Sequence, residues 1–178
     1  FIKPLKDYFR LNIKYDKLMI GAHCDDETIF GGFDLLREQG WKVIIVTNPS
    51  QGARNMYRKN EFINIMKKLK CQYEIWNYDN NKKVMTWNID EVTARIQNEI
   101  NSRNYVKIIT HNKKGEYGHI QHRAIHEIVT NVANNKNLEF FSKNRIRQDL
   151  LPDYNELLDM YASKGGYKGL IHYINNLK

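Results

Sequence analysis

Short apolar runs alternate with longer segments of helical period along the chain, a pattern typical of βαβ units and a mostly parallel sheet. Four runs predict strands, and one more is the candidate for a fifth. The runs are Leu18–Ala22, Val43–Thr47, Tyr73–Trp76, Tyr105–Thr110 and Leu138–Phe141. This order predicts an α/β fold: a single Rossmann-like domain over residues 1–178, with a mostly parallel sheet flanked by helices.

The segments between these runs place apolar residues on one helical side. The predicted helices are Thr28–Glu38, Arg54–Leu69, a segment beginning at Asn88, a segment beginning near Gly118 or His119, and Tyr154–Tyr161. Asn88 with Glu91 three residues later is typical of a helix N-terminus. Gly31 and Gly32 indicate close packing of the first helix.

Composition supports one globular domain, because 178 residues with 42% hydrophobic side chains can build a core. No apolar run approaches the roughly 18 to 20 residues of a membrane helix, so we expect no membrane span. Cys24 and Cys71 cannot form a disulfide framework, and we therefore expect a protein of the reducing cytoplasm.

The chain is basic, with 28 Lys and Arg against 20 Asp and Glu and a net charge of +8. Such a charge favours encounters with phosphates, anionic lipids or nucleic acid. The basic residues are dispersed in small groups such as Lys82 and Lys83, without the interleaved aromatic residues of a nucleic-acid platform. We therefore expect a solvated basic surface and no nucleic-acid partner.

Acidic side chains and one imidazole directly follow the first predicted strand. The segment Ile20–Glu27 places His23, Asp25 and Asp26 at the carboxyl edge of the sheet. Adjacent carboxylates repel one another unless a cation compensates their charge. Because His23 and Asp26 are three residues apart on a tight turn, both can reach one metal ion while Asp25 points elsewhere.

A histidine-rich segment follows the fourth predicted strand and contains His111, His119, His122 and His126. In a doubly wound sheet the first and fourth strands are neighbours, so the loops after them flank one crevice. Catalytic zinc uses three protein ligands and leaves a position for water. The topology therefore predicts a metal site in which His119 or His122 joins the cluster after the first strand.

Each cluster alone also has an ordinary structural interpretation. Acids favour the N-terminus of a helix through its dipole, and the histidines can be hydrogen-bonded side chains of the core or surface. For either cluster alone the two interpretations stay open. Their joint placement at one edge of the sheet favours the metal site.

The chain contains two longer motifs, Ala22–Glu27 followed by Gly31 and Gly32, and Gly115–His122. Both resemble the signatures of the PIG-L/LmbE-like zinc-dependent deacetylase family. Thr47 and Arg58–Glu61 resemble a third element between them, so the similarity covers Leu18–Val132. Tyr161–Ser163 is similar to a tail motif of the family.

The resemblance implies an LmbE-like fold and a site that holds Zn²⁺ as its cofactor. The implied zinc ligands are His23, Asp26 and His122. Asp25 would be the general base toward the attacking water, and Tyr117 and His119 would lie near the developing oxyanion. Arg58, whose planar guanidinium offers several fixed donors, is the expected sugar or phosphate contact, and Arg54 and Glu116 are candidate substrate-binding residues by their position alone.

Several of these roles have alternatives. A structural position behind the ligands is the alternative for His119, and a helix-surface ion pair with Glu61 is the alternative for Arg58. We expect His111 and His126 to pack or support the site, because a fourth protein ligand would close it to water.

Three residues differ from the usual family motifs. Cys24 and Ile120 stand where proline is usual or common, and Gln121 stands where aspartate is common. Cys24 adds a soft ligand, although we expect it not to bind the metal. Gln121 lacks a carboxylate that would orient a neighbouring histidine, so we expect an effect on rate or pH optimum rather than on reaction type.

The expected function is removal of the N-acetyl group from an amino sugar of the N-acetylglucosamine type, giving a free amine and acetate. The expected partner is a conjugated amino sugar, carried on a nucleotide, lipid or glycan. The alternative is a non-catalytic sugar- or nucleotide-binding module that retains the fold. A third hypothesis, a nucleic-acid-binding protein, depends on net charge alone.

Overall fold

The computed structural model describes residues 15–48, 53–81, 83–134 and 137–161. Its five strands form one parallel sheet in the order β3-β2-β1-β4-β5. The strands are β1 (Lys17–Gly21), β2 (Trp41–Thr47), β3 (Gln72–Tyr78), β4 (Lys107–Thr110) and β5 (Leu138–Phe140). The five predicted strands and the parallel α/β fold are confirmed.

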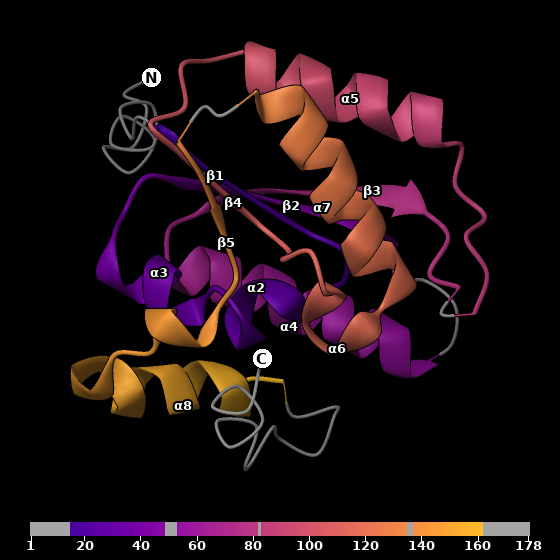
Figure 1. Cartoon of the computed structure of the whole chain (residues 1–178). Coiled ribbons are helices and arrows are strands. Elements are labelled where there is room, and N and C mark those ends of the chain that lie inside the picture. The colour runs from indigo at the N-terminus through magenta and orange to yellow at the C-terminus, as the bar shows by residue number, and fades with distance from the viewer. Residues whose placement is uncertain (1–14, 49–52, 82, 135–136, 162–178) are drawn as a thin grey trace, which may run out of the picture.

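Helices cover both faces of this sheet, as Figure 1 shows. One face carries α5 (Ile89–Asn101) and α7 (Ile120–Ala133). The other carries α2 (Asp26–Ile29), α3 (Gly32–Arg37) and α4 (Ala53–Lys68), with α8 (Leu151–Asp159) packed against α2 and α3. Shorter pieces are α6 (Gly115–Gly118), η1 (Lys143–Arg145) and η2 (Gln148–Leu150).

The central strands are buried on both faces, which explains why they read as continuous apolar runs. Side chains alternate between two core clusters because successive residues of a strand point to opposite faces. Leu18 and Ile20 of β1 join the cluster formed with α5 and α7. Met19 joins the cluster formed with α3, α4 and α8.

The start of α5 follows the predicted cap. Asn88 precedes the helix, and its side-chain oxygen accepts a hydrogen bond from the backbone N–H of Glu91 at 3.3 Å. Val92, Ile96 and Ile100 then bury one side of the helix. This buried side packs α5 onto the face of the sheet opposite α8.

The prediction of one continuous helix over Thr28–Glu38 is wrong, because the segment forms two short helices, α2 and α3. Helical hydrogen bonding restarts at Gly31, whose carbonyl accepts from the N–H groups of Asp34 and Leu35. At this break the backbone lies close to the sheet. A Cβ at Gly31 would lie 2.5 Å from the Met19 methyl carbon.

Gly32 permits a second close approach, since a Cβ there would lie 2.9 Å from the ring of Tyr154 in α8. The predicted close packing at both glycines is confirmed. Helix α8 is thereby held directly against the segment that follows β1. Within the described parts of the chain, every helix is too short or too polar to cross a bilayer.

Candidate metal centre and active site

The adjacency of β1 and β4 brings the two motif segments together. Ile20 of β1 is in register with Thr110 of β4, whose hydroxyl donates to the Ile20 carbonyl at 2.9 Å. Just beyond this pair, the backbone N–H of Ala22 donates to His111 Nε2 at 2.9 Å. The predicted meeting of the loops after these two strands is confirmed.

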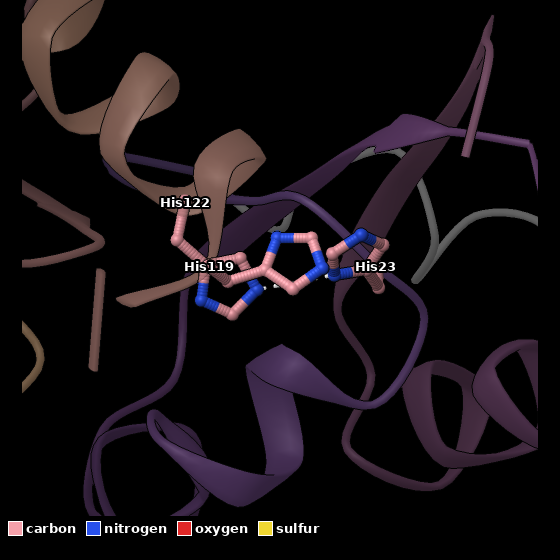
Figure 2. Close-up of side chains that lie close together, drawn as sticks. All are labelled: His23, His119 and His122. Carbon is pink, nitrogen blue, oxygen red and sulfur yellow. Dashed lines mark hydrogen bonds between the residues drawn. The ribbon is translucent and has the colours of Figure 1, made fainter. Parts of the chain in front are cut away.

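Three side-chain atoms converge beyond these strands, from His23, Asp26 and His122. His23 Nδ1 lies 3.2 Å from Asp26 Oδ2 and 3.1 Å from His122 Nε2, and His122 Nε2 lies 3.3 Å from Asp26 Oδ2. Figure 2 shows the rings of His23 and His122 turned toward each other, with His119 beside them. A tetrahedral zinc ion with bonds of about 2.0 to 2.1 Å separates its ligand atoms by roughly 3.3 Å.

The far nitrogen of each converging histidine is held by a hydrogen-bond acceptor. His122 Nδ1 lies 2.7 Å from Glu116 Oε2, and His23 Nε2 lies 2.7 Å from Gln121 Oε1. Both oxygens accept, so each ring carries its proton there and, when neutral, presents a lone pair at the other nitrogen. Such partners are typical of metal-binding histidines.

Among the described residues, two groups have side-chain atoms close enough to hold one metal ion: His23, His119 and His122 form one, and Asp26, His111 and His122 form the other. His111 belongs to the second group. However, its Nε2 accepts from the N–H of Ala22, and its Nδ1 lies 2.8 Å from Glu116 Oε2. Both nitrogens of the ring are therefore occupied. This geometry fits support of the site and leaves the His111 lone pair unavailable to a metal.

The charges around His23, Asp26 and His122 favour the ionised form of the Asp26 carboxylate. Burial alone would raise the pKa of Asp26, but the positive charge on His122 and His23 outweighs burial and lowers it well below its usual range. Burial opposes protonation of His122, but ion pairs with Asp26 and Glu116 raise its pKa to about 9. In the absence of a metal, a proton on His122 therefore takes the place of the cation.

Asp25 adopts an unusual backbone conformation at the start of α2, with φ of 137°. Its N–H donates to Glu27 Oε2 at 3.0 Å, and its own Oδ2 lies 3.0 Å from Arg58 Nη2. Burial raises the pKa of Glu27 to about 7, and hydrogen bonds from Tyr161, Thr28 and Asp25 oppose that rise. A positive φ at a non-glycine residue is costly and is common at functional sites.

His119 caps α7, and its Nδ1 accepts from the N–H of Gln121 at 3.2 Å. A neutral His119 therefore carries its proton on Nε2, where it can donate. Its ring lies edge-on to His23, with centroids 4.6 Å apart. Tyr117 is 54% exposed and packs edge-on against both His119 and His122.

The other expected site residues occupy different positions. Arg58 lies beside Asp25 and is buried. Arg54 falls in the first turn of α4, and its side chain lies outside the described part of the structure. Glu116 has no exposed side-chain atom for a substrate to reach, because its carboxylate is enclosed by His111 and His122.

Cys24 is fully buried in the core, and neither ligand group among the described residues includes it. Gln121 reaches its histidine as an amide, and its Nε2 donates to the backbone carbonyl of Asp79 at 2.8 Å. This second bond fixes which end of the amide faces His23. Neither the Asp79 contact nor the support from Glu116 was visible in the sequence pattern.

With this geometry established, comparison with known proteins gives the family. The sequence model of the PIG-L family, described as GlcNAc-PI de-N-acetylase, matches residues 18–133. The chain belongs to the PIG-L family. This PIG-L chain is also 44% identical to the Uncharacterized protein L374 of Acanthamoeba polyphaga mimivirus, over 89% of the chain and 78% of that protein.

Solved structures share the fold of this PIG-L chain at low sequence identity. The N,N'-diacetylchitobiose deacetylase of Pyrococcus horikoshii matches with a TM-score of 0.68 and 12% identity, over 92% of this chain and 80% of that one. GalB, the 4-carboxy-2-hydroxymuconate hydratase of Pseudomonas putida KT2440, matches with a TM-score of 0.63 and 12% identity. The match covers 89% of this chain and 82% of GalB. Because a deacetylase and a hydratase share this fold, the site must decide the reaction.

Proposed function

We propose that the protein is a zinc-dependent N-deacetylase that releases acetate from an N-acetylated amino sugar. The observation that carries this proposal is the convergence of His23 Nδ1, Asp26 Oδ2 and His122 Nε2 within 3.1 to 3.3 Å of one another. These spacings and the fixed ring protons fit a tetrahedral zinc site with one position left for a further ligand.

His23, Asp26 and His122 would hold the zinc ion, which would supply a Lewis acid that polarises the amide carbonyl and makes the attacking water more acidic. Asp25 follows His23 by two residues and does not belong to the converging set. Its carboxylate accepts the proton of the attacking water and returns it to the departing amine. Arg58 holds this carboxylate in place at 3.0 Å.

Negative charge develops on the carbonyl oxygen as the water oxygen bonds to the carbonyl carbon. His119 is positioned to donate from Nε2, because its Nδ1 already accepts from the backbone. Tyr117 provides an exposed hydroxyl beside the same rings. Cleavage of the C–N bond then gives acetate and a free amino group.

The substrate class follows from the family description and from the deacetylase of similar fold. An N-acetylglucosamine-type sugar carried on a nucleotide, lipid or glycan is the substrate we propose. Arg58 has one edge toward Asp25 and, as a planar group with several donors, suits a sugar hydroxyl or a phosphate oxygen. Glu116 and Gln121 orient the two ligand histidines in this account.

The direct test is release of acetate or free amine from a panel of N-acetyl sugars, nucleotide sugars and glycolipids, with added zinc or with a chelator. Asp25→Asn is expected to retain one zinc per chain and to lose activity by about 10²- to 10⁴-fold, because proton transfer to the base is lost. His122→Ala is expected to lose both zinc and activity.

The matched control is Asp90→Asn, which changes an exposed acid on α5 and should leave both properties unchanged. Near-normal turnover by the Asp25 variant would overturn the assigned base. Zinc-loaded protein that binds these sugars but hydrolyses none of them over a broad pH range would instead favour the non-catalytic binding module.

A further inference from the structure

A tyrosine that lies two residues after α8 reaches the segment that carries the proposed base. Tyr161 lies beyond the matched residues 18–133, yet its hydroxyl donates to Glu27 Oε1 at 2.6 Å. We propose that Tyr161 is a positioning residue that fixes Asp25 through Glu27. This inference rests on the proposed role of Asp25 in deacetylation.

Glu27 is the intermediary in this chain of contacts. Its side chain is fully buried, and its two oxygens accept from three donors. Oε1 accepts from Tyr161 and from the Thr28 hydroxyl at 2.7 Å, and Oε2 accepts from the N–H of Asp25. A buried carboxylate is costly unless such donors satisfy it, so each of them constrains where the group lies.

The constraint matters because Asp25 has a strained backbone with φ of 137°. A residue keeps such a conformation only when its surroundings hold it there. The hydrogen bond from its N–H to Glu27 is one interaction that stabilises this conformation, and the ion pair of its carboxylate with Arg58 is another. If Glu27 shifts, the N–H of Asp25 loses its acceptor and the carboxylate loses its fixed direction.

Tyr161 is well suited to serve as a fixed anchor. It is fully buried and lies two residues after α8, which is held against the segment after β1. In α8, the ring of Tyr154 stacks on Phe33 with centroids 4.2 Å apart, and its hydroxyl donates to the Ile29 carbonyl at 2.7 Å. Helix α8 therefore holds Tyr161 in a fixed position relative to the segment that carries the base.

The test is Tyr161→Phe, which removes one hydroxyl and keeps the ring. In the zinc-loaded enzyme we expect kcat to fall by at least about tenfold, with KM changed less than about twofold and zinc content unchanged, because misplacement of a reacting group affects the chemical step. In the zinc-free protein, hydrogen-exchange protection of the Asp25 amide should also fall by at least about tenfold.

Tyr154→Phe is the matched control, because it removes an equally buried hydroxyl from the same helix without touching Glu27. We expect it to keep both kcat and the protection of the Asp25 amide. Thr28→Val removes the other donor to Oε1 and should lower that protection in the same direction as Tyr161→Phe.

Wild-type values of kcat and Asp25 protection in Tyr161→Phe would overturn the inference. An equal loss in Tyr154→Phe would also overturn it, since the effect would then come from loosening of α8. The exchange measurement needs neither zinc nor turnover. A loss of protection in a protein without deacetylase activity would therefore refute the proposed function while leaving the positional link intact.

Discussion

At the scale of single residues, the two ligand histidines are held by unlike partners. His122 donates to the carboxylate of Glu116, whereas His23 donates to the neutral amide of Gln121. A carboxylate partner makes a histidine more basic than an amide partner does. Protons and zinc should therefore compete mainly at His122.

The first prediction concerns this competition. Because the pKa of His122 is raised to about 9, the zinc-free protein holds a proton there at neutral pH, and zinc must displace it. We expect the apparent zinc affinity to rise by about tenfold per pH unit from pH 7 and to level off above about pH 9. Calorimetry in buffers of different ionisation enthalpy would measure release of this proton at pH 7.

The same shift has a consequence for the stability of the zinc-free fold. A pKa raised on folding contributes stability that is full below the unfolded value of about 6.5 and is lost as the pH rises through about 9.

A zinc affinity that does not change between pH 7 and pH 9 would contradict the ion-paired state of His122.

At the scale of elements, the strands were easier to predict than the helices beside the site. The buried strands produce unbroken apolar runs, so their positions could be read from the sequence. The segment 28–38 also has apolar residues at helical spacing, and its adjacent Gly31 and Gly32 were interpreted as close packing rather than as a break. At Gly31 an added Cβ would lie 2.5 Å from Met19 of β1, and periodicity does not record such a contact with another element.

The packing of α8 on this segment gives a prediction at the same scale. Gly32→Ala would place a methyl group 2.9 Å from the rigid ring of Tyr154. We expect the free energy of unfolding to fall by about 1 to 3 kcal/mol, because overpacking forces one of the two helices to move. Urea unfolding measures this change.

An alanine substitution without such a contact serves as the comparison. Gln97→Ala lies on an exposed position of α5 and should change the free energy of unfolding by no more than about 0.5 kcal/mol. Equal stability of the two variants would show that Tyr154 can move away at no cost.

At the scale of the whole molecule, topology determined how much of the site could be foreseen. The rule that the first and fourth strands are neighbours predicted the meeting of two clusters separated by about 90 residues. The order β3-β2-β1-β4-β5 and the convergence of His23 with His122 agree with it. The resemblance narrowed the choice to His122, which the spacing alone had left open.

The supporting contacts could not be predicted in the same way. Tyr161 and Glu27 are 134 residues apart, and no strand rule connects the end of α8 with the turn after β1. Glu116 was expected to face a substrate, because its place in the motif does not reveal the direction of its side chain. In the structure its carboxylate contacts His111 and His122, and its backbone has a positive φ of 58° that the motif does not reveal.

The central claim is that one zinc ion binds to His23 Nδ1, Asp26 Oδ2 and His122 Nε2. The most direct measurement is a crystal structure of the zinc-loaded protein with anomalous diffraction recorded on both sides of the zinc absorption edge. The account predicts one strong peak about 2.0 to 2.2 Å from all three atoms. A peak ligated by His111 or Cys24, or the absence of a peak between His23 and His122, would contradict it.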